Sequence, residues 1–308
     1  GLAVKWSKIM LYHTLHKTHS QIPAELATFY DDIVSPAFGT DTHVVNTLVK
    51  CALSLWRLLK GAGLRISSSK TTITTSVPQV ARLVQQELVK EGLSIKRARA
   101  CVDLGVDSAA GARRSTKAST DRVVTSCRYL KGIGTLRSAG VPAEKLVRVG
   151  PEANWAYGIE AYGLSKSSEA KLRAATADAC GRPGAQGCPI TTIALTLGTE
   201  ADPFTVAACR SIGWWIDNWY RKWAPLPLWR RAWLRIRAEL CDAAFKWTAV
   251  RGPIGTVIVY LHLLGWQHNA ADKWVDEIGN GWNFTPAFQG ISRHSLVIAA
   301  VKRAAASR

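Results

Sequence analysis

Two adjacent aspartates near the N-terminus, Asp31 and Asp32, are the residues of this sequence best suited to chemistry. Hard cations such as Mg²⁺ take carboxylate oxygens as ligands. Nucleotide transfer uses two such ions, one to activate the attacking hydroxyl and one to hold the leaving phosphates. In such a site Asp31 would be the principal ligand and Asp32 its companion. The alternative is an acidic surface turn, because aspartate also favours turns.

The residues on either side of the aspartates predict a hairpin that would hold them at its turn. Residues 24–29 and 33–38 are short extended segments, with Tyr30, Asp31 and Asp32 between them. Pro36 indicates that the second strand is short or lies at a sheet edge.

Helices and further short strands are expected after the hairpin. A helix is predicted over 44–59, with Asp41 or Thr42 at its start, and a second over 79–90. Strands are predicted at 64–66 and 100–106. The first helix follows from apolar residues at three- and four-residue steps, namely Val44, Val45, Leu48, Ala52, Leu55, Trp56 and Leu59.

Three motifs in order resemble the reverse transcriptases of non-LTR retrotransposons. Phe29-Tyr30-Asp31-Asp32 is similar to the aromatic-x-Asp-Asp catalytic box of that family, and a long helix carrying Trp56 follows it. Residues 63–71, Gly-Leu-Arg-Ile-Ser-Ser-Ser-Lys-Thr, are similar to the next family segment, with serine at 67 where asparagine is usual. Leu104-Gly105-Val106 is similar to the family's Leu-Gly element.

The resemblance implies RNA-directed DNA synthesis by a polymerase palm. It implies two Mg²⁺ ions on Asp31 and Asp32, and Lys70 beside the nucleotide phosphates. It also implies that Leu104 and Gly105 grip the primer strand. The partners would be an RNA template, a DNA primer and dNTPs. For Lys70 the alternative is an exposed lysine in a loop rich in serine and threonine.

Part of the family's metal site is missing from this sequence. The family places another aspartate and a template-gripping Gln-Gly segment well before the catalytic box, but the 28 residues before Phe29 contain no aspartate. The chain also lacks an initiator methionine at its start. We therefore expect a C-terminal fragment that is inactive by itself.

The pattern becomes almost wholly helical after Gly111, which gives an α+β chain overall. We expect a partial palm at 1–110, a helical thumb at 111–200 and a helical extension rich in Trp and Arg at 201–308. Helices are predicted near 117–139, 142–149, 151–163, 168–180, 203–222 and 226–249, and one or two more before a terminal tail.

A large positive charge favours a polyanionic partner. Forty Lys and Arg against 22 Asp and Glu give a net charge of +18, and nucleic acid is the leading candidate, ahead of an anionic membrane surface. Basic side chains of a thumb would hold phosphates without reading sequence, whereas the alternative is a solvated helix face. The candidates for these contacts are Arg113, Arg114, Lys117, Arg122, Arg128 and Lys131.

Tryptophans concentrate in residues 210–237 together with basic residues. They can stack bases, but their spacing follows one helical stripe and favours packing between helices. A Trp-rich basic helix lying on a membrane is disfavoured, because Pro225 and Pro227 interrupt the stripe.

The seven cysteines form no CxxC pair, which argues against a disulfide framework or a zinc site and favours a reducing compartment. We expect no membrane partner, because no apolar run is long enough to span a bilayer, and an intracellular location, nuclear or cytoplasmic. The competing function is a non-enzymatic, basic, helical nucleic-acid-binding protein.

Overall fold

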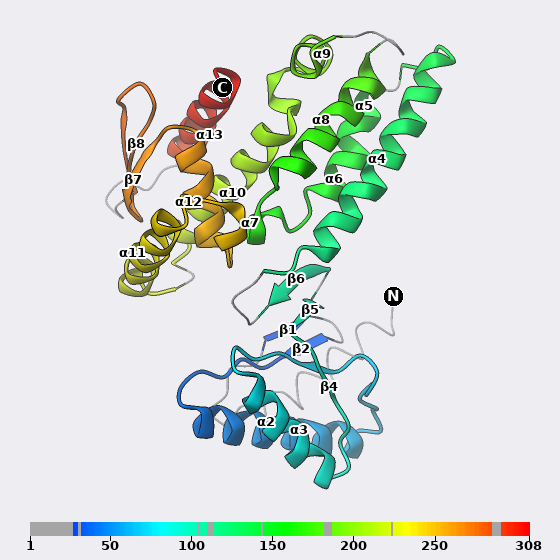
Figure 1. Cartoon of the computed structure of the whole chain (residues 1–308), viewed down its shortest axis with the longest axis vertical. Coiled ribbons are helices and arrows are strands. Elements are labelled where there is room, and N and C mark those ends of the chain that lie inside the picture. Colours follow the sequence, from blue (N-terminus) through cyan, green and yellow to red (C-terminus); the bar gives the residue numbers. More distant parts are fainter. Residues whose placement is uncertain are drawn as a thin grey trace. The chain divides into compact units, whose positions relative to one another are not determined.

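The computed structural model describes residues 27–29, 32–103, 105–109, 114–142, 144–181, 187–222, 224–284 and 291–308. The chain forms two compact units (Figure 1). The first comprises Gly1–Leu104 and Ser108–Ala112, and the second comprises Gly105–Asp107 and Arg113–Arg308. Helices and small sheets make the fold α+β, as predicted. The assignment of palm, thumb and extension stays a prediction.

The first unit combines two helices with short strand pairs. β1 pairs antiparallel with β2, and β3 pairs parallel with β4. The antiparallel hairpin expected at residues 29–32 is confirmed, because Thr28 lies opposite Ile33. Asp32 was expected in the turn but is the first residue of β2, opposite Phe29. The elements are β1 (Ala27–Phe29), β2 (Asp32–Val34), α2 (Asp41–Gly61), β3 (Thr72–Ile73), α3 (Pro78–Lys90), β4 (Lys96–Arg97) and β5 (Ala100–Asp103).

The core of the first unit lies between α2 and α3. In α3, Val80, Val84 and Leu88 recur at four-residue steps and are buried. They pack with Ile73, Leu93 and Ile95, and partly buried apolar side chains of α2 cover them. Both helices were predicted correctly, because apolar residues recur at helical spacing in the sequence.

Two local predictions in the first unit were wrong. Thr40 begins α2 as its N-cap, with its hydroxyl accepting a hydrogen bond from the backbone of His43, so neither Asp41 nor Thr42 has that role. Residues 64–66 form no strand. Instead the Leu64 amide donates to the Leu59 carbonyl at 2.9 Å and closes the end of α2.

The second unit is mainly helical and ends with a small sheet and a helix. The helices expected near 117–139, 168–180 and 203–222 are confirmed. The elements are β6 (Val106–Ala109, which straddles the division), α4 (Lys117–Ser138), α5 (Glu144–Val147), the π-helical η1 (Arg148–Glu152), α6 (Ala153–Trp155), α7 (Ile159–Tyr162), α8 (Lys166–Cys180), α9 (Pro189–Thr196), η2 (Thr199–Ala201), α10 (Pro203–Tyr220), α11 (Leu226–Asp242), η3 (Trp247–Ala249), α12 (Pro253–Leu263), β7 (Gln267–Ala270), β8 (Lys273–Val275), β9 (Gly281–Asn283) and α13 (Ile291–Ala306).

The antiparallel sheet β7-β8-β9 contradicts the expectation of a purely helical ending. Residues 226–249 are also not one helix, because α11 ends at Asp242 and the separate turn η3 follows. Ala244 and Phe245 adopt positive φ angles of 50° and 51°, a conformation that a helix does not tolerate. None of the described helices has both the length and the apolar character needed to cross a bilayer.

Tryptophans of α10 and α11 build the core of the second unit, as the spacing predicted. Trp215 and Trp233 are 1% and 0% exposed, and their ring centroids lie 4.9 Å apart. Their indole groups donate hydrogen bonds to the carbonyls of Ala271 and His268, at 3.2 and 3.1 Å. Buried indole N–H groups need such acceptors, so these bonds attach the sheet region to both helices.

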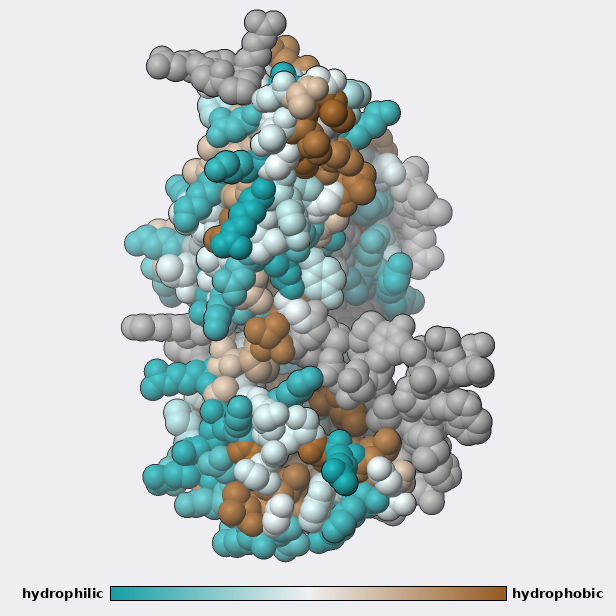
Figure 2. Space-filling view, turned by 90° about the vertical axis from the view of Figure 1, so that its right-hand side faces the viewer, coloured by the Kyte–Doolittle hydropathy of each residue, from teal (hydrophilic) through white to brown (hydrophobic). Residues whose placement is uncertain are grey.

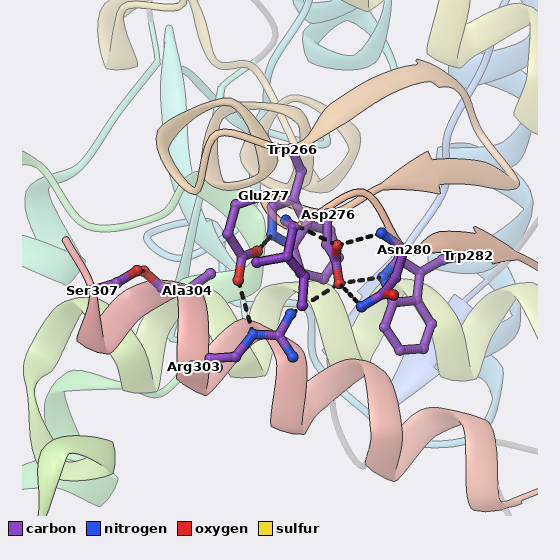
Figure 3. A network of polar contacts seen from close by, with 9 residues as sticks. Trp266, Asp276, Glu277, Asn280, Trp282, Arg303, Ala304 and Ser307 are labelled. Atoms are coloured by element: carbon purple, nitrogen blue, oxygen red, sulfur yellow. Dashed lines mark hydrogen bonds and ion pairs between the residues drawn. The ribbon is translucent and has the colours of Figure 1, made fainter.

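The C-terminal helix α13 is held against the turn between β8 and β9 by a network of polar contacts (Figure 3). Asp276 is fully buried and accepts hydrogen bonds from the Asn280 amide at 2.7 Å and from Arg303 of α13 at 2.9 Å. Burial alone would raise the pKa of Asp276, but the hydrogen bonds outweigh it and lower the pKa. Glu277 accepts from both Trp266 and Arg303, so the network joins the α12–β7 connection, the β8–β9 turn and α13.

Candidate nucleic-acid interface

The β1–β2 hairpin positions the acidic box at the level of the backbone. In this register Phe29, the last residue of β1, is paired with Asp32, the first residue of β2. Asp31 itself lies outside the described residues, and Asp32 is the first residue of β2. Carboxylates carried on a tight hairpin are a suitable donor set for Mg²⁺. Among the described side chains, no group of three or more His, Cys, Asp or Glu gathers as metal ligands.

Lys70 lies in a compact turn of the first unit. The Ser67 carbonyl accepts hydrogen bonds from the amides of Lys70 and Thr71, at 3.1 and 2.8 Å, and from the Thr71 hydroxyl at 2.8 Å. The Lys70 side chain is exposed and has no ion-pair partner among the described residues. It is therefore accessible to an anionic ligand, while its role beside a nucleotide stays a prediction.

Arg114 and Arg122 are occupied within the second unit, unlike exposed phosphate-binding residues. Arg114 donates to the Tyr162 carbonyl at 2.7 Å and lies 5.9 Å from the Trp247 ring; burial lowers its pKa. Arg122 donates to the carbonyls of Tyr157 and Gly105 and stacks on the Tyr157 ring at 4.8 Å. These contacts indicate that both arginines position the start of α4.

Gly105, which the resemblance places at the primer strand, has a backbone conformation that suits glycine. Its φ angle is +78°, and a Cβ atom there would lie 2.8 Å from Nη2 of Arg122. The same φ angle divides the single strand expected over 100–106 into β5 and β6. Leu104, the other residue of the motif, lies outside the described residues.

Three of the predicted phosphate-binding residues form an exposed stripe along α4, which we call the basic stripe: Lys117, Arg128 and Lys131. The steps of eleven and three residues bring them back to one side of the helix, over a length of about 21 Å. None of the three has an ion-pair partner among the described residues. Asp121 is exposed on the same side, and Arg113 lies outside the described residues.

Asp107 is a residue of this region that the sequence did not reveal. It is buried, and its carboxylate accepts hydrogen bonds from the Ser115 hydroxyl and from the Ala118 and Ser119 amides, at 3.0, 3.1 and 3.1 Å. It thus satisfies free amides in the first turn of α4, where Thr116 makes no side-chain cap. Because Asp107 lies ten residues before the helix, no local capping signature marked it.

The remaining basic residues of 113–148 are divided between internal contacts and solvent. Arg137 donates to the Gly181 carbonyl, and Arg148 pairs with Glu200 at 3.0 Å. Lys145 is exposed and lies on α5, beyond the basic stripe. The structure therefore supports only part of the predicted set as available to a polyanion.

Comparison of the chain with protein-family models, with curated proteins and with solved structures returned no match.

Proposed function

We propose that this chain carries the C-terminal palm and the thumb of a reverse transcriptase of the non-LTR retrotransposon type. The parent enzyme would synthesise DNA on an RNA template. The observation that supports the proposal is the antiparallel register of β1 and β2, in which Phe29 pairs with Asp32 across the motif. The three family-like motifs in order add support.

Asp31 and Asp32 would hold Mg²⁺, which supplies activation of the primer hydroxyl and neutralisation of the leaving phosphates. Lys70 would lie beside the nucleotide phosphates. The basic stripe on α4 would hold the backbone of the primer–template duplex, where contacts position the strands without reading bases. The further aspartate that the family requires is absent from residues 1–28, so residues 1–308 would hold only part of the metal site.

The test is templated DNA synthesis. Residues 1–308 with primer–template, dNTPs and Mg²⁺ are expected to extend no primer. A longer chain that also contains the residues encoded upstream of the Gly1 codon is expected to extend the primer. The Asp31→Ala variant of this longer chain is expected to lose the activity. Asp121→Ala, exposed on α4, is the matched control.

Two results would contradict the proposal. One is an upstream sequence without an open frame encoding an aspartate-bearing strand and a Gln-Gly segment. The other is synthesis by the lengthened chain that survives Asp31→Ala.

The second candidate is a non-enzymatic nucleic-acid-binding module, and the exposure of Lys117, Arg128 and Lys131 on one side of α4 favours it. Both candidates predict salt-dependent duplex binding. The two candidates differ in the effect of Asp31→Ala. This substitution abolishes DNA synthesis by a polymerase but leaves duplex binding by a non-enzymatic module unchanged.

A further inference from the structure

An exposed apolar surface lies where α4 ends and the chain turns back through α5 and η1. We call it the apolar patch: Tyr129, Leu136, Val141, Leu146 and Val149, which are 55%, 45%, 44%, 45% and 75% exposed. Figure 2 shows apolar atoms gathered among polar ones in its upper part, at the height of α5 and the end of α4 in Figure 1. Contiguous apolar surface on a folded protein marks a site of interaction.

The two segments that supply the patch run side by side and in opposite directions. The Ser126 hydroxyl donates to the Pro151 carbonyl at 3.0 Å, and further along α4, Leu130 and Ile133 pack with Val147. The Val141 amide donates to the Leu136 carbonyl at 3.1 Å, which fixes the turn between them. The patch is therefore built on a rigid helical scaffold.

Positive charge lies on both sides of the patch. Arg128 is exposed on α4, about a quarter turn around the helix from Tyr129 and Leu136, and Lys145 is exposed on α5. Neither Arg128 nor Lys145 pairs with a carboxylate among the described residues. A second copy of the chain would bring the same positive charge against this surface, so self-association there is disfavoured. Nucleic acid would use the charges but gains little from aliphatic side chains, since its bases stack on aromatic rings.

We propose that the apolar patch is a docking site for an acidic amphipathic helix of a protein partner. Leucine-type side chains on one face of that helix, at three- and four-residue steps, cover the patch. Glutamates or aspartates beside this face meet Arg128 and Lys145. The patch contains no tryptophan or phenylalanine, which interfacial membrane segments favour, so a protein helix suits it better than a lipid surface. The proposal does not rest on the polymerase assignment, but it shares Arg128 with the basic stripe.

The probe is a fluorescently labelled helical peptide with leucines at three- and four-residue steps and glutamates on both flanks. Fluorescence anisotropy with the full chain is expected to give micromolar binding that weakens about tenfold or more with Val149→Asp or Leu146→Asp. Leu195→Asp on α9 is the matched control, because Leu195 is 83% exposed in the same unit but outside the patch. The Leu195→Asp chain is expected to bind the peptide with unchanged affinity.

Hydrogen exchange supplies the second measurement, and bound peptide is expected to protect amides of residues 129–149. Four results would overturn the proposal. These are no binding at the highest soluble peptide concentration, equal binding of a peptide with lysines in place of glutamates, equal binding by the Val149→Asp and Leu195→Asp chains, and binding of phosphatidylserine vesicles but not of the peptide.

Discussion

The basic residues of α4 and of the segment that precedes it differ in what their side chains contact. Arg114 and Arg122 donate to backbone carbonyls and lie over aromatic rings, whereas Lys117, Arg128 and Lys131 point to solvent. Sequence alone could not separate the two groups, because the carbonyl partners of Arg114 and Arg122 lie between 17 and 48 residues away along the chain. Charge content was predictable, and accessibility was not.

A substitution at Gly105 tests whether the backbone conformation at this position requires glycine. Gly105→Ala should lower the free energy of unfolding by roughly 1–2 kcal/mol, because an L-residue is disfavoured at φ +78° and its Cβ would crowd Arg122. Gly132→Ala is the control within α4, where no atom lies within 4 Å of the added Cβ. The control should gain up to about 1 kcal/mol from helix propensity. Urea denaturation measures both, and shifts of the same sign would refute the argument.

His268 gives the second unit a pH-dependent stability. Its pKa is lowered from 6.5 to about 4, mainly by burial and further by the positive charges of Arg237 and His262. The unfolded chain binds a proton near pH 6.5, but the folded chain does so only near pH 4. Stability from this residue is therefore complete above pH 6.5 and falls between pH 6.5 and 4, by on the order of 3 kcal/mol.

The measurement is chemical denaturation at several pH values in that window, for the original chain and for His268→Phe. Phenylalanine keeps a buried ring beside Phe245, 5.6 Å away, and cannot titrate. The variant is expected to lose most of the pH dependence between 6.5 and 4. An unchanged slope would show that other groups carry it.

At the scale of elements, α4 carries both the basic stripe and part of the apolar patch. Asp107 satisfies its first turn, and along one side Leu130 and Ile133 pack with residues of α8. The helix is thereby fixed at its start and along one side, and the basic stripe is left on a side open to solvent.

The basic stripe predicts a salt-dependent interaction with duplex. Lys117→Glu, Arg128→Glu and Lys131→Glu together should weaken binding of an RNA–DNA hybrid and reduce the salt slope by about three, since each phosphate contact contributes about 0.9. Fluorescence anisotropy at several salt concentrations measures both quantities.

The matched control makes the same charge change elsewhere in the second unit. Lys166→Glu, Lys246→Glu and Lys302→Glu alter exposed residues outside α4. Their chain should keep most of the salt slope. An equal loss in both chains would mean that net charge, rather than the stripe, attracts the duplex.

Helices were easier to predict than strands for a physical reason. α2 and α3 carry apolar residues at helical spacing over many turns, so their existence follows from local sequence. β8 and β9 have only three residues each, too few to show an alternation. The sheet that they form with β7 is held by contacts of Trp215 with Ala271 and of Trp233 with His268, which come from distant helices.

At the scale of the molecule, the two compact units have unequal cores. The buried cluster between α2 and α3 consists of seven residues, whereas the main cluster of the second unit includes several tryptophans with less than 2% exposure. Because burial of apolar area supplies most of the stabilisation, we expect the first unit to unfold at a lower urea concentration.

Hydrogen exchange at increasing urea tests this order of unfolding. Amides of α3 should lose protection before those of α10, with two separate midpoints. A single midpoint shared by both helices would show that the units unfold as one cooperative body.

Main-core residues of the second unit extend from Val123 in α4 to Ala304 in α13. A ribosome must therefore add well over a hundred residues after Val123 before this core can close, which takes roughly ten to forty seconds at ordinary elongation rates. The cluster of the first unit, by contrast, is complete once Ile95 has emerged. During that interval the tryptophan helices of the nascent chain remain without their final partner, and they are the segments on which we expect chaperones to act.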